Sequence, residues 1–276
     1  MSRILQFYLI ACSLLQVNSF NADMRDFDDP KYAGVLETYQ LNHTHQTLNY
    51  VLKQKEKYCT HPKVTMTMWE VAVKMLKFID ESDPDIHQPQ LYHALQVAQA
   101  MRKDGLSDEW IVAGFIHDFG KVLYFFDEPQ WAIVGDTFPV GCQFSDKIIL
   151  HHFFADNPDI NNEKYATKYG IYKPHCGLEN IHISWGHDEY LYHVIKNSKL
   201  SDEIKYAIRF HSFYPHHEHN AYEHLLNDRD HTMLKWINRL NGYDLYTKVD
   251  ESMDIDHLLA YYKELIDQFF PDPLKW

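Results

Sequence analysis

The 276-residue sequence is poor in cysteine, and its four cysteines show none of the spacings that mark a metal or redox motif. Cys12, Cys59, Cys142 and Cys176 form no CxxC pair, which excludes a zinc ribbon and a dithiol redox centre. Four cysteines in a chain of this length also argue against a disulfide scaffold.

Basic charge is in deficit as well. The sequence has 26 Lys and Arg against 39 Asp and Glu, so its formal net charge is −13. This balance is opposite to the one that neutralises nucleic-acid phosphates or attracts an anionic membrane surface. We therefore expect no nucleic-acid partner and no requirement for a membrane.

The one long apolar run occupies residues 4–17. It follows Arg3 and precedes the small polar stretch Asn18-Ser19, the order of a secretory signal peptide, although an apolar helix packed on the body fits equally well. The run is too short and too polar for a membrane span. Its cleavage would leave three cysteines, and an odd number argues against an oxidising compartment. We expect a cytoplasmic protein, with the secretory pathway as the alternative if residues 1–20 are a signal peptide.

What the sequence has in abundance is histidine, with 19 residues in an acidic chain that is 45% hydrophobic. The apolar content suffices for a sizeable core and excludes a disordered chain. Imidazoles and carboxylates together form the mixed nitrogen and oxygen ligand set that suits iron, manganese or zinc. We divide the chain into an apolar amino-terminal segment, 1–22, and a single domain, 23–276.

From Gln88 onward the apolar periodicity is helical, so we expect an all-α fold. Gly105 should end a first helix, Ser107 should cap the next, and Gly120 should end that helix just after His117-Asp118. Residues 129–180 show little periodicity and several Pro and Gly residues, and we expect a long irregular connection there that could contain a hairpin.

Similar signals delimit the helices that follow. Ser184 is the expected cap of a helix that carries His187, and Ser201 the cap of one that carries His211 and ends by Pro215. A later helix should stop at Asn241-Gly242, immediately before Asp244, and a last one should span residues 258–266.

Six residues could supply ligands, and each falls within or at the end of an apolar helix. Singly they are weak signals, since a histidine such as His211 is more often a hydrogen-bonded core residue and Asp244 could be a helix-stop residue. Together they suit a metal site in a helical bundle, because ligands must converge from several elements and a carboxylate can bridge two cations. The six are His93, His117, Asp118, His187, His211 and Asp244.

The order His…His-Asp…His…Asp resembles the HD-domain superfamily, whose members bind one or two metals in a helical core, mostly for phosphohydrolysis. The flanking sequences resemble one family more closely, the myo-inositol oxygenases, from about Arg25 to Trp276. The matching segments, in family order, are DESDPD at 80–85, LYHA at 91–94, IHDFGK at 116–121, GDTFPVGC at 135–142, PHCGL at 174–178, SWGHDEY at 184–190, RFHSFYP at 209–215 and DLYTK at 244–248.

This resemblance implies an HD-domain-type helical bundle that cleaves myo-inositol with O2, its co-substrate, to D-glucuronate. It also implies two iron ions per chain, in a mixed-valent Fe(II)/Fe(III) centre. By the family pattern His93, His117 and Asp244 would hold one iron, His187 and His211 would hold the other, and Asp118 would bridge them. Asp118 and Lys121 would be the catalytic residues.

The resemblance further implies that polar groups bind the substrate, and an uncharged hexol does require several hydrogen bonds to fix its orientation. Without the resemblance, Arg25, Asp80 and Lys248 would be interpreted as solvated surface charges. The expected substrate-binding residues are Arg25, Asp80, Lys121, Asp136, Ser212 and Lys248.

Some features depart from the family pattern. The apolar amino terminus does, and His151-His152 matches no family segment. The run His216-His217-Glu218-His219 should be a solvated loop, because it follows a helix-ending proline, and Cys142 and Cys176 should be small buried thiols.

The alternative function is that of an HD-domain metal-dependent phosphohydrolase. A phosphate substrate would require a basic cluster, and only Lys121, Arg25 and Lys248 are expected near the site. We expect a monomer, because no coiled coil or self-complementary patch is evident.

Overall fold

The computed structural model describes residues 32–80, 82, 88–246 and 256–276. The amino-terminal run and the predicted substrate residues Arg25 and Lys248 lie outside the described residues. Of the helices that are described, none combines the length and the apolar character needed to cross a membrane.

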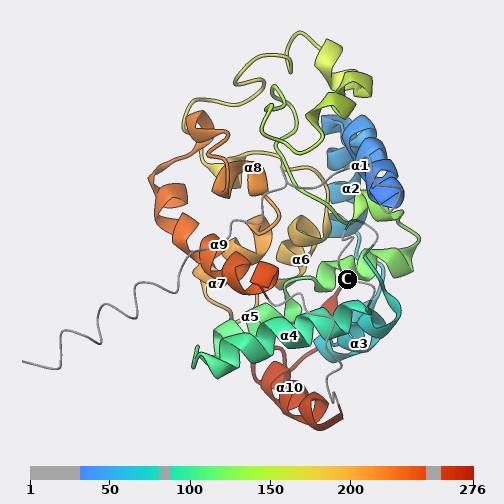
Figure 1. Cartoon of the computed structure of the whole chain (residues 1–276), viewed down its shortest axis with the longest axis vertical. Helices are drawn as coiled ribbons and strands as arrows, with labels where there is room; N and C mark the ends of the chain where they lie inside the picture. Colours follow the sequence, from blue (N-terminus) through green and yellow to red (C-terminus); the bar gives the residue numbers. More distant parts are fainter. Residues whose placement is uncertain (1–31, 81, 83–87, 247–255) are drawn as a thin grey trace, which may run out of the picture.

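The expected all-α class is confirmed, since helices dominate and the only sheet among the described residues pairs two short antiparallel strands, β1 and β2 (Figure 1). Short 3-10 and π segments, labelled η, link the α-helices. In chain order the elements are α1 (Ala33–His45), α2 (Leu48–Lys55), η3 (Glu56–Thr60), β1 (Thr65–Met66), α3 (Met68–Lys74), η4 (Met75–Lys77), α4 (Gln90–Lys103), α5 (Asp108–Ile116), η5 (Phe119–Phe126), η6 (Gln130–Ala132), η7 (His151–Asp156), η8 (Pro158–Asn161), η9 (Leu178–Asn180), α6 (His187–Ile195), α7 (Asp202–Phe210), α8 (Tyr214–His217), η10 (Glu223–Leu225), α9 (Asp228–Tyr246), α10 (Asp256–Phe269) and β2 (Leu274–Lys275).

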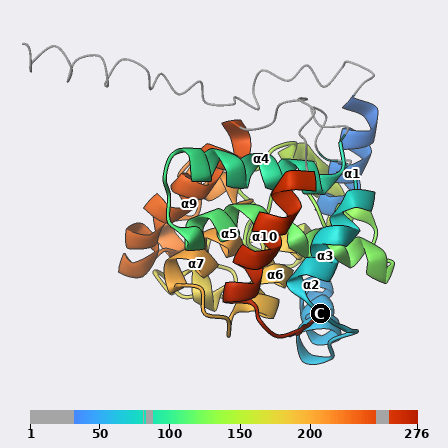
Figure 2. The same ribbon diagram turned by 90° about the horizontal axis from the view of Figure 1, so that it is seen from below.

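The core is organised around α5. Every residue of this helix from Trp110 to Ile116 is buried, as expected of a helix that is apolar all round. Helices α4, α7, α9 and α10 pack against it, and Figure 2 shows α5 enclosed between them. The carboxyl end of α5 therefore opens into the interior, where polar side chains can be placed only if they are paired.

Several predicted helix ends are confirmed. Gly105 follows α4 with φ of 72°, the left-handed conformation that glycine adopts without strain. Ser107 and Ser201 are the N-cap residues of α5 and α7. The last predicted helix corresponds to α10.

Two expected boundaries around the histidines are wrong. Gly120 does not end α5, because the helix stops at Ile116 with His117 as its C-cap, and Gly120 lies within η5. Ser184 does not cap α6, whose N-cap is Gly186; instead the Ser184 hydroxyl accepts a hydrogen bond from the Phe138 amide.

Two expected helix stops are wrong as well. Pro215 lies in the first turn of α8, where its missing N–H costs no hydrogen bond, and α7 already ends at Phe210. Helix α9 runs through Asn241-Gly242 to Tyr246. The Asn241 side chain donates to the backbone carbonyl of His211 at 3.1 Å, so a tertiary contact uses the group that would favour a turn.

The connection over residues 129–180 is long and irregular, as expected. It contains short 3-10 segments and forms no hairpin, because its isolated bridge joins Pro139 to Ile183 beyond the connection. Cys142 is buried, and burial raises the pKa of its thiol to about 12. The expectation of a buried Cys176 is wrong, because this residue is only partly buried.

Gly120 lets η5 approach the backbone of α6 closely. A Cβ atom at this position would lie 1.9 Å from the carbonyl oxygen of His187, a backbone atom that cannot move independently. Gly114, six residues earlier and within α5, would instead place its Cβ 2.7 Å from the Sδ atom of the flexible Met101 side chain and 3.0 Å from Val97 Cγ1, with no backbone atom among its nearest contacts.

We expect Gly120→Ala to lower the free energy of unfolding by about 3 kcal/mol or more, because the added methyl group forces η5 away from α6. Gly114→Ala is the matched control and should change it by about 1 kcal/mol or less, since Met101 can shift and alanine favours the helix. Urea denaturation of both variants measures the difference. Equal losses of stability would contradict the backbone contact at Gly120.

Candidate metal centre

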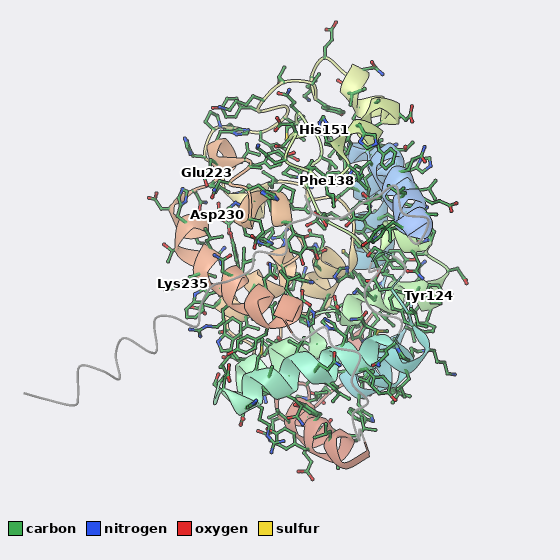
Figure 3. The ribbon with its side chains drawn as sticks, viewed as in Figure 1. Tyr124, Phe138, His151, Glu223, Asp230 and Lys235 are labelled. Carbon is green, nitrogen blue, oxygen red and sulfur yellow. The ribbon has the colours of Figure 1, made fainter. Side chains whose placement is uncertain are left out.

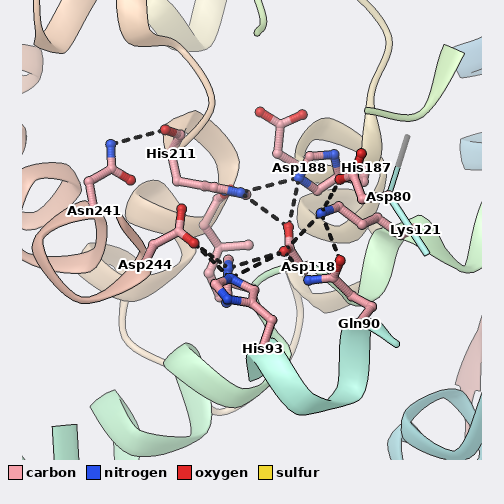
Figure 4. A network of polar contacts seen from close by, with 12 residues as sticks. Asp80, Gln90, His93, Asp118, Lys121, His187, Asp188, His211, Asn241 and Asp244 are labelled. Carbon is pink, nitrogen blue, oxygen red and sulfur yellow. Dashed lines mark hydrogen bonds and ion pairs between the residues drawn. The ribbon is translucent and has the colours of Figure 1, made fainter. Parts of the chain in front are cut away.

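The structure brings all six predicted ligand residues together in the interior (Figure 4). They come from five helices. His93 lies in the second turn of α4, His117 is the C-cap of α5 and Asp118 follows it, and His187 is the first residue of α6. His211 is the C-cap of α7, and Asp244 lies in the last turn of α9. Because α5 ends at Ile116, the consecutive side chains of His117 and Asp118 can both face the same centre.

Backbone carbonyl groups orient three of the four imidazoles. The Nδ1 atoms of His117, His187 and His211 lie 2.8, 2.7 and 2.7 Å from the carbonyl oxygens of Gly114, Ile133 and Ile208. A carbonyl oxygen only accepts, so each Nδ1 carries a proton and each Nε2 points toward the centre, where it can offer its lone pair to a metal ion that displaces any proton there. This is how proteins hold histidine ligands of metals.

The Asp118 carboxylate lies between two groups of histidines. Its Oδ2 atom is 3.3 Å from His117 Nε2 and 3.8 Å from His93 Nε2, and its Oδ1 atom is 3.0 Å from His187 Nε2 and 3.6 Å from His211 Nε2. Asp244 Oδ1 joins the first group, at 2.8 Å from His93 Nε2 and 3.4 Å from His117 Nε2. We call His93, His117 and Asp244 the first half-site, and His187 and His211 the second half-site.

The donor atoms fit metal cations better than they fit one another. His187 Nε2 and His211 Nε2 are 3.2 Å apart, and two lone pairs at this distance repel unless a proton or a cation lies between them. His117 Nε2 is buried and makes no well-aligned hydrogen bond among the described residues, although carboxylate oxygens of Asp118 and Asp244 lie 3.3 and 3.4 Å away. Neutral imidazoles and ionised carboxylates suit a divalent transition metal.

The charges of the centre also call for a cation. Burial opposes ionisation of Asp118 and Asp244, but the neighbouring imidazoles, and Lys121 beside Asp118, hold the pKa of both carboxyls well below the usual range. Burial lowers the pKa of His117, yet the two carboxylates outweigh burial and raise it to about 10. Either a proton or a metal ion can supply this positive charge, so metal binding should release a proton.

A polar network surrounds the Asp118 carboxylate. Lys121 is buried, and its Nζ atom lies 2.9 Å from Asp118 Oδ2, 2.7 Å from Asp80 Oδ2 and 3.2 Å from Gln90 Oε1. Burial disfavours the ammonium, but Asp118 and Asp80 raise the Lys121 pKa above its ordinary value. The Asp80 side chain is only 10% exposed, so its interpretation as a solvated surface charge is wrong.

Sequence reasoning missed Gln90, whose Nε2 atom donates to Asp118 Oδ2 at 2.6 Å. Its place three residues before His93, on the same face of α4, could have indicated it. Asp188 was missed too. Its carboxyl is fully buried, burial raises its pKa, and the Thr137 hydroxyl lies 3.4 Å from it. The signal for Asp188 was a second His-Asp dipeptide, His187-Asp188.

Two other predicted substrate residues lie on segments that adjoin the centre. Asp136 accepts a hydrogen bond from the Tyr39 hydroxyl at 2.9 Å, and the next residue, Thr137, donates its amide to the backbone oxygen of Ser212. Ser212 is buried and follows His211. The roles of these residues in substrate binding stay predictions.

The expectation of a solvated loop is wrong for His216 and His217, which are buried in α8, and is confirmed for Glu218 and His219, which are exposed. His217 Nε2 lies 3.0 Å from the carbonyl oxygen of His211, which also accepts from Asn241. His151 and His152 instead line a cavity of about 580 Å³ whose lining includes none of the six predicted ligands, and Figure 3 labels His151 in the upper part of the view. No metal-binding group of His, Cys, Asp or Glu occurs at that cavity among the described residues.

Fold and site together define an all-α protein with a buried histidine and carboxylate centre suited to metal ions. Comparison with known proteins identifies the family. The family profile described as "Myo-inositol oxygenase" matches residues 32–276. The inositol oxygenase of Dictyostelium discoideum is 48% identical over 251 residues, which cover 88% of this chain and 86% of that protein.

Two further relatives are similar. Inositol oxygenase 1 of Arabidopsis thaliana is 45% identical over 94% of this chain and 86% of its own length. The inositol oxygenase of Mus musculus is 44% identical over 90% of this chain and 88% of its own length. The chain belongs to the myo-inositol oxygenase family, and the resemblance noted in the sequence is confirmed.

We expect Asp118→Ala to prevent retention of a second metal ion, because Asp118 is the one side chain among the described residues that contacts histidines of both half-sites. Asp230→Ala is the matched control. It removes another buried carboxylate, one that accepts from the Leu178 amide and the Tyr206 hydroxyl, and it should lower stability without metal loss. Metal analysis of both purified variants decides the matter. An Asp118→Ala chain that still holds two metal ions would refute the bridge.

Proposed function

We propose that the chain cleaves the ring of myo-inositol with dioxygen to D-glucuronate at a centre of two iron ions in a mixed-valent Fe(II)/Fe(III) state. The observation that carries the proposal is the Asp118 carboxylate, whose two oxygen atoms each face a different set of histidines. Membership of the myo-inositol oxygenase family supports the choice of substrate and reaction.

His93, His117 and Asp244 would hold one iron, His187 and His211 the other, and Asp118 both. Nitrogen and oxygen ligands of this kind suit iron, and the second half-site, with fewer protein ligands, leaves more positions for substrate and oxygen. When bound, the iron pair would supply the dioxygen activation and the electron transfer that no amino-acid side chain provides.

The protein's own share begins with binding and orienting an uncharged hexol. Asp80, Lys121, Asp136 and Ser212, together with Arg25 and Lys248, would donate and accept the hydrogen bonds that select which carbon faces the oxidant.

Lys121 is positioned to stabilise negative charge on a substrate oxygen. Its ammonium group is held by Asp80 and Asp118 and is buried, so it acts in a region of low dielectric constant where its field is strong. Asp80 keeps the ammonium in place, and Gln90 links it to the bridging carboxylate. The burial of the ligands also limits the access of water to reactive species.

The alternative, a metal-dependent phosphohydrolase, is less well supported. A phosphate ester would need several cationic side chains, whereas Lys121 is the one Lys or Arg among the described residues that pairs with a carboxylate of the centre. We further propose a cytoplasmic monomer. The free thiols of Cys59, Cys142 and Cys176 support the compartment, since secreted proteins more often pair their cysteines.

The purified, iron-loaded and partly reduced protein should consume O2 and form one D-glucuronate per myo-inositol, and removal of iron by a chelator should stop both. Oxygen uptake, product formation and iron content are measured on the same sample. A preparation with two metal ions per chain that leaves inositol intact would contradict the substrate, and phosphate esters would be tested next.

Lys121→Met should keep both metal ions and lower kcat by about 100-fold or more, because it removes the buried positive charge and none of the proposed ligands. Lys57→Met is the matched control, since Lys57 pairs with the buried carboxylate of Glu128, which contacts no residue of the centre. Steady-state kinetics with metal analysis test both variants. Unchanged turnover in Lys121→Met would remove Lys121 from the mechanism.

A further inference from the structure

An ion pair buried between α6 and α7 stands out beside the second half-site. Glu189 lies two residues after His187, and Arg209 lies two residues before His211. Each partner of the pair is thus on the same helix as one of the two histidines. Helices α6 and α7 pack against each other, and Figures 1 and 2 show them as neighbours in both views.

The contact is two-pronged and almost free of solvent. Arg209 Nε donates to Glu189 Oε2 at 2.7 Å and Arg209 Nη2 donates to Glu189 Oε1 at 3.1 Å, while the Glu189 side chain is fully buried. Lys55, from α2, adds a contact of 2.7 Å to Glu189 Oε1. The Arg209 guanidinium also lies 4.4 Å from the ring centroid of Tyr192, which belongs to α6.

Stability alone is a weak explanation for this pair. Desolvation offsets much of the attraction between buried charges, and apolar residues of similar volume often stabilise a fold equally well. The planar guanidinium does fix geometry, because two parallel hydrogen bonds to one carboxylate set both distance and angle. A geometric role is therefore the better explanation.

That geometry bears on the two histidines. Residues two apart in a helix point in directions that differ by about 200°. The ion pair consequently joins α6 to α7 on a side away from the centre, while His187 and His211 face each other at 3.2 Å on the other. Two contacts on different sides restrict rotation of one helix against the other, which a single contact would permit.

The second half-site depends on this restriction more than the first does. The first half-site has three residues of its own, drawn from α4, α5 and α9, whereas the second has only two histidines besides the shared Asp118. With so few ligands, metal affinity depends strongly on how well the two imidazoles are oriented in advance.

We infer that Glu189 and Arg209 are positioning residues that orient α6 and α7 so that His187 and His211 bind the second metal ion. The inference rests on the proposed dinuclear centre. The pair touches neither metal nor substrate, and it acts through the two histidines.

The test is an anaerobic titration of the metal-free, full-length protein with Fe(II), which resolves the affinities of the first and second equivalents. Arg209→Lys keeps the positive charge but loses the two-pronged contact. This variant should lower the affinity for the second equivalent of Fe(II) by about 10- to 100-fold and leave the affinity for the first within about twofold of wild type. Glu189→Gln should do the same.

Glu128→Gln is the matched control, since Glu128 is also buried and accepts hydrogen bonds from Gln54 and Tyr58 at a distance from the centre. It should lower the Tm and leave both equivalents unchanged. If Arg209→Lys and Glu189→Gln fail to fold, Lys55→Met decides by the same criterion. It removes one of the two cationic side chains that hold the Glu189 carboxylate in place, so it should weaken binding of the second equivalent only, by a smaller factor.

The inference is overturned if a folded Arg209→Lys chain binds the second equivalent as tightly as wild type, or if both equivalents weaken alike. It is also overturned if Glu128→Gln gives the same selective loss. A wild-type chain that binds one equivalent only would overturn the dinuclear centre itself, a result distinct from the others because it needs no variant.

Discussion

The shared carboxylate of Asp118 is the constraint on which the architecture depends. A buried anion is tolerated only when cations or hydrogen-bond donors surround it, so His117, His187 and Lys121 must all reach one point in the interior. This requirement explains why α5 ends where it does. With His117 at the C-cap, the chain leaves the helix and two successive side chains face the same centre, which a regular helix would direct 100° apart.

Much of this arrangement could be predicted from the sequence because it rests on residue type and local periodicity. The all-α class and the helix ends at Gly105, Ser107 and Ser201 follow from short-range preferences, which act on a few adjacent residues. Where a helix-breaking sequence led to a wrong prediction, a contact distant in sequence outweighed the local preference. Asn241-Gly242 has a strong local tendency to stop a helix, but Asn241 instead bonds the carbonyl of His211, 30 residues away in sequence.

The supporting residues of the site were harder to find, because their partners lie far away along the chain. Gln90 contacts Asp118 across 28 residues, and the His217 ring lies 2.9 Å from the side-chain amide of Asn241, 24 residues further along the chain. Such contacts leave no periodic pattern in the sequence. The proposed ligands can be recognised from their residue types and their order along the chain, because both match the family. The groups that orient them depend on three-dimensional packing and cannot be found in this way.

Packing also separates the two halves of the centre. The first half-site combines proposed ligands from three helices that pack on one another, so its geometry follows from the core itself. The second depends on support from outside: the carbonyls of Ile133 and Ile208 orient its imidazoles, and Gly120 brings η5 against the backbone of His187. A centre that must accept a polyol and oxygen needs open coordination positions, and positions stay open only where protein ligands are few. The orientation of the two imidazoles in the second half-site therefore has to be fixed by the neighbouring residues that contact them.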